Sequence, residues 1–78
     1  MAQAAREAEG ADDHAVAFGP RLRRMRQGAG LTLKDLAAKA GIAVSTVSKI
    51  ENDRMSPTYD VLLKLAAGLG VDLATLLT

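Results

Sequence analysis

The sequence predicts an all-α fold: five short helices in a compact bundle, the second and third forming a helix-turn-helix. Seventy-eight residues make one small domain. Of its hydrophobic residues only Phe18 and Tyr59 are aromatic, so the core is aliphatic, as in helices packed on helices. Two helical patterns are joined only by Gly41-Ile42-Ala43. A connection this short makes the two helices cross at a steep angle.

The charge is unevenly distributed along the chain. Residues 1–18 contain Arg6 against four acidic residues, a net charge of −3, and we expect them to form an acidic, flexible leader. Residues 19–78, the predicted helical domain, contain nine lysines and arginines against five acidic residues, a net charge of +4. This asymmetry favours a polyanionic partner, although ordinary solvating charges would also explain it.

Several classes of function are disfavoured by composition. The chain has no cysteine and only one histidine, His14, so we expect no metal site and no cofactor. It has no clustered carboxylate pair with a basic partner, which argues against an enzyme. No apolar run approaches the length of a membrane span, and the N-terminus lacks a signal-peptide pattern. We therefore expect a soluble, cytoplasmic protein that does not bind a membrane.

The first helix is predicted to open at Gly19-Pro20, because proline is favoured at the first helical position, and to end at Gly28 and Gly30. Leu22 and Met25 lie three residues apart on its inner face. Four arginines surround that pair, and they form either a solvated helix face or a phosphate-contacting patch: Arg21, Arg23, Arg24 and Arg26.

The second helix begins after Thr32, which is predicted to cap it together with Asp35. Gly41 supplies the left-handed conformation that ends the helix. The buried stripe between these signals consists of Leu36, Ala37 and Ala40.

The third helix, residues 44–52, has two different faces at 100° per residue. The inner face contains Thr46, Val47, Ile50 and Glu51. The outer face contains Val44, Ser45, Ser48, Lys49 and Asn52. Such an outer face, small, polar and cationic, occurs on ordinary surface helices, but its short side chains would also let the backbone approach a groove closely.

A loop over residues 53–56 leads to a fourth helix, which Ser56-Pro57 is predicted to start and Gly70 to end. Its buried arc comprises Val61, Leu62, Leu65, Ala66 and Leu69. Asp72 is expected to cap a final helix, with Val71 and Leu76 as its hydrophobic staple. Three apolar residues are left outside these arcs, either as a dimer surface or as isolated exposed residues: Leu63, Ala67 and Leu77.

Residues 21–77 resemble the Cro/C1-type (Xre family) helix-turn-helix domain of phage repressors and bacterial regulators. The strings RLRRMR, GLT, DLAAKAGI, STVSKIEN, SPT and LLKLAAGLGV carry the resemblance. It implies a lambda-repressor-like DNA-binding domain. It also implies base contacts from Val44, Ser45 and Lys49, and phosphate contacts from Arg23, Thr46, Asn52 and Arg54. In this family, the residues that correspond to Arg26 and Glu51 form a structural salt bridge.

Two positions depart from the family pattern. Leu33 replaces a glutamine that usually reaches a phosphate in this family, so one expected phosphate contact is in doubt. Leucine at this position resembles the subgroup of the family whose members carry an appended cupin domain. Ala43 replaces the usual serine cap of the third helix, which costs about 1 kcal/mol of capping.

The expected function is transcriptional regulation by sequence-specific binding of double-stranded DNA. A homodimer would read the major groove with residues 44–52, and repression is favoured over activation. The alternatives are a protein-interaction or antitoxin-like module on the same fold, or the N-terminal DNA-binding part of a longer regulator with a cupin-type effector domain.

Overall fold

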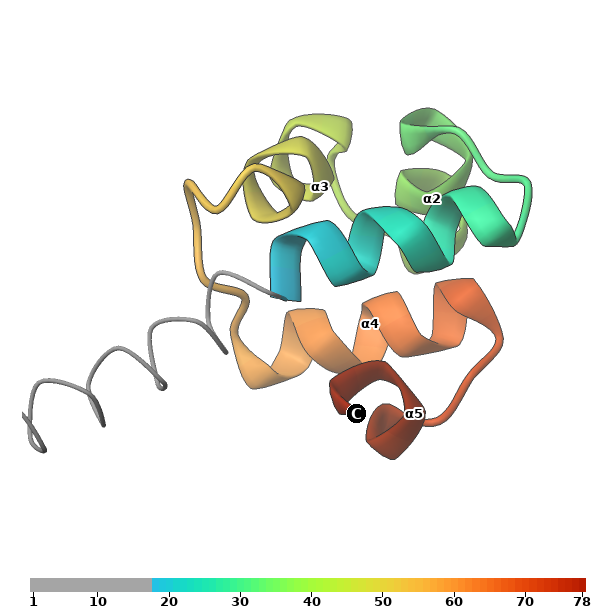
Figure 1. Ribbon diagram of the computed structural model, residues 1–78. Coiled ribbons are helices and arrows are strands. Elements are labelled where there is room, and N and C mark those ends of the chain that lie inside the picture. The colour runs from blue at the N-terminus through green and yellow to red at the C-terminus, as the bar shows by residue number, and fades with distance from the viewer. Residues whose placement is uncertain (1–17) are drawn as a thin grey trace, which may run out of the picture.

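The computed structural model describes residues 18–78, which consist of helices and short connections (Figure 1). Residues 18–28 are helical and are followed by α2 (Leu33–Ala40), α3 (Val44–Glu51), α4 (Tyr59–Leu69) and α5 (Leu73–Leu77). The predicted all-α fold, with a helix-turn-helix made by α2 and α3, is confirmed. The predicted acidic leader lies outside the described residues, apart from Phe18.

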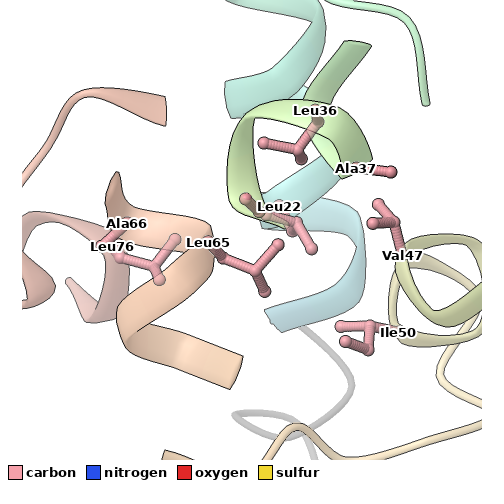
Figure 2. Close-up of a cluster of buried hydrophobic side chains, with 9 residues drawn as sticks. Leu22, Leu36, Ala37, Val47, Ile50, Leu65, Ala66 and Leu76 are labelled. Carbon is pink, nitrogen blue, oxygen red and sulfur yellow. The ribbon is translucent and has the colours of Figure 1, made fainter. Parts of the chain in front are cut away.

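A single aliphatic core joins the five helices of residues 18–78 (Figure 2). α2 packs against both α3 and α4, and α5 packs against α4. The buried hydrophobic residues are those that the helical spacing predicts for α2, together with Leu22, Val47, Ile50, Leu65, Ala66 and Leu76. Phe18 is half-buried against this cluster. The core therefore holds α3 from one side only and leaves its other side at the surface.

Local signals end and begin most of these helices as expected. Thr32 and Asp35 form the reciprocal capping box at the start of α2, with both hydrogen bonds 3.0 Å long. Gly41 follows α2 in the left-handed conformation, with φ of 73°. The side chain of Asp72 caps α5 by accepting a 2.8 Å hydrogen bond from the backbone N–H of Thr75. These caps fix where α2 begins and ends and where α5 begins.

Two predicted helix starts are wrong. The first helix already includes Phe18 and Gly19, so Pro20 is not its first residue. α4 begins after Thr58 rather than Ser56, and the Thr58 hydroxyl accepts a 3.2 Å hydrogen bond from the N–H of Val61. The hydrophobic spacing does not distinguish the two possible starts of α4, because neither Pro57 nor Thr58 belongs to the buried stripe.

Candidate nucleic-acid interface

α3 has one face in the core and one face in solvent. Val47 and Ile50 are 0% and 1% exposed, so they anchor the helix against the rest of the domain. Val44, Ser45 and Lys49 are exposed on the opposite side. The three side chains expected to meet base edges thus lie together on the outer face of one short helix.

The turn between α2 and α3 fixes the direction of α3. The N–H of Ile42 donates to the carbonyl oxygen of Ala37 at 3.0 Å, which closes the end of α2 around the left-handed Gly41. Ala43 then takes an extended conformation as the N-terminal cap of α3, but no side chain accepts a hydrogen bond there. Ile42 is half-buried against the core. Only these three residues connect α2 to α3, and the two helices pack against each other.

Arg26 and Glu51 form a buried, two-pronged ion pair between the first helix and α3. Arg26 Nε lies 2.6 Å from Glu51 Oε2, and Arg26 Nη2 lies 3.1 Å from Glu51 Oε1. The Glu51 side chain is 1% exposed. The hydrogen bond to Glu51 raises the pKa of the Arg26 guanidinium, partly offset by desolvation. A third Arg26 nitrogen donates to the carbonyl of Leu31 at 2.9 Å, so the guanidinium also ties down the segment that precedes α2.

Arg23 links the first helix to the C-terminal end of α3. Its Nη2 donates to Asn52 Oδ1 at 2.9 Å, and its Nε lies 3.4 Å from Glu51 Oε1. Asn52 in turn donates to the carbonyl of Ser48 at 2.8 Å. Two residues expected to contact phosphates, Arg23 and Asn52, are therefore brought together, and Arg23 remains about half exposed.

The last turn of α3 orients Arg54. Asn52 is the C-cap, and Asp53 adopts the left-handed conformation with φ of 59°. The N–H of Arg54 then donates to the carbonyl of Lys49 at 2.8 Å, which closes the end of the helix. Arg54 is exposed beside Asn52, whereas Thr46 is half-buried in the first turn of α3.

The arginines of the first helix have different roles. Arg21 donates from Nε and Nη2 to the carbonyls of Leu76 and Thr75, both at 3.0 Å, so it holds the end of α5. Arg26 is buried with Glu51, while Arg23 and Arg24 are exposed. Neither sequence-based interpretation fits all four arginines, because two are structural. The role of Arg21 has no local signal, since its partners lie more than 50 positions away along the chain.

The residues expected at a dimer surface are all exposed. They lie on two elements, Leu63 and Ala67 on α4 and Leu77 at the end of α5. Tyr59, which the sequence reasoning left out, is 67% exposed and lies four residues before Leu63. Residues four apart share one face of a helix, so Tyr59 continues the apolar line of Leu63 and Ala67.

Residues 18–78 show neither a metal-binding cluster nor a membrane-spanning helix. Residues 18–78 contain no group of three or more potential ligands that could hold a metal ion. Among the helices described, none is both long and apolar enough to cross a membrane.

The chain is similar to known regulators across this region. Residues 22–76 match the model of the family described as helix-turn-helix. The HTH-type transcriptional regulator DdrOP3 of Deinococcus deserti is 42% identical over 57 residues, which cover 73% of this chain and 44% of that protein. The HTH-type transcriptional regulator SinR of Bacillus subtilis is 42% identical over 61 residues, covering 77% of this chain and 55% of SinR. The chain thus spans about half the length of these curated relatives.

A solved structure also resembles the fold. It is that of the restriction-modification controller protein C.AhdI from Aeromonas hydrophila. It superposes with a TM-score of 0.76 and 32% sequence identity, covering 83% of this chain and 97% of that one.

Proposed function

This chain belongs to the Cro/C1-type helix-turn-helix family of transcriptional regulators, and on that premise we propose that it binds double-stranded DNA sequence-specifically. The family is one of regulators rather than enzymes. In the proposed complex α3 enters the major groove, where each base pair presents a distinct pattern of donors and acceptors. We propose that it acts in the cytoplasm, where its DNA target would lie.

The observation that carries the proposal is the exposed outer face of α3. Lys49 offers donors to guanine O6 and N7, Ser45 offers a hydroxyl that both donates and accepts, and Val44 offers a methyl contact to thymine. All three are exposed, while the opposite face of the helix is anchored by the core and by Arg26. A recognition surface on a firmly held helix loses little freedom on binding.

Four residues around this face are proposed to contact phosphates. Arg23, Asn52 and Arg54 are exposed at the C-terminal end of α3, and Thr46 lies in its first turn. The Arg23–Asn52 hydrogen bond positions two of these groups before DNA arrives. Such contacts set the register on the duplex and make the affinity depend on salt, without choosing a sequence.

We further propose that the active form is a homodimer joined through Leu63, Ala67 and Leu77. A two-fold axis through this surface would present two copies of α3 to successive turns of the major groove, about 34 Å apart. Repression is proposed in preference to activation, because occupying the groove is enough to exclude polymerase, whereas activation needs a further contact with it.

Selection from a pool of random duplexes tests this function. The intact chain is expected to enrich a two-fold symmetric motif whose half-sites are one helical turn apart. Enrichment of an asymmetric motif would contradict the homodimer but not DNA reading. Failure to retain any duplex at low salt would reject DNA binding and favour a protein-interaction module on the same fold.

A further inference from the structure

Two parts of the chain carry opposite charge. Residues 1–17 contain one basic residue, Arg6, and four acidic ones, Glu7, Glu9, Asp12 and Asp13. The C-terminal end of α3 is surrounded by the exposed cations Arg23, Lys49 and Arg54, with Asp53 as the neighbouring carboxylate. The buried Glu51 carboxylate pairs with Arg26 and also lies 3.4 Å from Arg23 Nε, so it partly offsets the charge of Arg23 but not the charges of Lys49 and Arg54.

The start of the first helix lies against the end of α3 (Figure 1). A Cβ atom placed on Gly19 would come within 2.7 Å of the carbonyl oxygens of Ile50 and Glu51, and within 2.5 Å of Asp53 Oδ1. Gly19 therefore permits a backbone approach that a larger residue would block. Residues 1–17 thus join the described fold beside the end of α3 that carries Lys49 and Arg54.

The chain is long enough for the acidic residues to reach these cations. Asp13 lies five residues before Phe18, and Glu7 lies eleven residues before it. An extended chain spans at most about 3.3–3.6 Å per residue, so these carboxylates reach up to roughly 17 Å and 38 Å from the first helix. An eight-residue helix such as α3 is only about 12 Å long.

We propose that the carboxylates of residues 1–17 pair with Arg23, Lys49 and Arg54 in the free protein and are displaced when DNA binds. The inference rests on the proposed DNA binding, which it extends to regulation: the N-terminal segment is an intramolecular competitor for the phosphates. Its attachment beside α3 keeps its effective concentration in the millimolar range, so weak individual pairs are sufficient. Charge complementarity selects this occupant of the outer face in the absence of DNA.

The competition has a definite salt dependence. Exposed ion pairs are weak and screened, so removing all four carboxylates is expected to tighten DNA binding about three- to tenfold at low salt. The gain shrinks as salt rises. Affinity is expected to fall more steeply with salt when the carboxylates are removed, because the cations then carry counterions that DNA releases.

The experiment uses the full chain with Glu7→Gln, Glu9→Gln, Asp12→Asn and Asp13→Asn combined, with the dissociation constant for one duplex measured at several salt concentrations. Tighter binding with a steeper salt dependence supports the proposal, and unchanged binding overturns it. Asp13→Asn and its control Asp60→Asn each remove one negative charge, the first from the N-terminal segment and the second from α4. A gain in DNA affinity from Asp60→Asn equal to that from Asp13→Asn would overturn the proposal in favour of a net-charge effect. Arg6→Gln is expected to weaken binding.

A measurement without DNA separates this inference from the proposed function. The backbone amide NMR signals of residues 49–54 are expected to differ in position between the wild type and the fourfold variant. Because the contact is intramolecular, this difference should stay the same when both proteins are diluted tenfold. Unshifted signals would overturn the contact, and dilution-dependent shifts would assign it to a second copy. If the signals shift but neither protein binds any duplex, the proposed function fails while the contact with α3 stands.

Discussion

The two faces of α3 divide stability from recognition within eight residues. On the inner face, Val47 and Ile50 are fully buried and Glu51 is fixed by two hydrogen bonds from Arg26. On the outer face, Val44 is 43% exposed and Ser45 and Lys49 project into solvent. Packing restricts the first set, whereas the second set is free to suit a ligand. Substitutions on the two faces should therefore have separable effects.

Removing Glu51 should produce the largest effect. Glu51→Ala leaves the Arg26 guanidinium buried without its partner, and we expect a loss of about 3–5 kcal/mol in the free energy of unfolding. Denaturation by urea measures it. Asp60→Ala is the matched control, because it breaks an exposed pair with Lys64 (3.2 Å) and should cost less than about 0.5 kcal/mol. Similar losses in the two variants would contradict the assignment of the inner face.

Arg23 lies at the border of the two faces. Arg23→Ala should weaken binding to every duplex by about 1–2 kcal/mol and lower the salt slope by about one. Titrations of cognate and random DNA at several salt concentrations measure both quantities. Arg24→Ala is the control, because it removes the same charge from the next position. The Arg24 side chain makes none of the hydrogen bonds described between the first helix and α3. A loss confined to the cognate sequence would show that Arg23 reads bases.

A new cap should stabilise α3 without changing either face. Ala43→Ser would let a side-chain oxygen accept a hydrogen bond from the N–H of Thr46, as Thr58 does for Val61 in α4. We expect a gain of about 1 kcal/mol in the free energy of unfolding. Ala43→Val adds a side chain without a capping oxygen and should bring no gain. Equal gains from serine and valine would show that the side-chain oxygen does not cap the helix.

Acid should weaken the domain through caps remote from the outer face of α3. The hydrogen bonds from Thr32 and Thr75 lower the pKa values of Asp35 and Asp72, respectively. Each carboxyl therefore binds its proton less readily in the folded chain than in the unfolded one. The stability it contributes is complete above about pH 4 and is lost as pH falls through the folded-state pKa.

Thermal unfolding from pH 6 to pH 2 measures this effect. Asp72→Asn keeps a capping oxygen but cannot titrate, so it should reduce the fall in the melting temperature. A fall as large as that of the wild type would show that other groups govern the acid sensitivity.

Much of the fold was predictable because its signals are local. The stripe of Leu36, Ala37 and Ala40, the cap at Thr32 and the turn at Gly41 all depend on residues within one or two helical turns of each other. The same spacing placed Val47 and Ile50 in the core. The starts of the first helix and of α4 were misjudged, because proline at a first position is only a preference and more than one residue could cap α4.

The contacts of the site were predictable only in part. Helical spacing separated Lys49 from Ile50, but it carries no information on partners in other helices. The bonds of Arg23 to Asn52 and of Arg21 to α5 join residues 29 and 54–55 positions apart, so they depend on how the helices pack. The pairing of Arg26 with Glu51 came from the family resemblance, not from spacing within this chain.

The most direct test of the division within α3 measures Lys49→Ala in two ways. Its free energy of unfolding should remain within about 0.5 kcal/mol of the wild type, because the side chain is exposed. Its binding to a selected site should weaken by about 1–3 kcal/mol, with relaxed preference at one base pair and a smaller loss on random DNA. An equal loss on both DNAs, or a stability loss as large as the binding loss, would contradict the account.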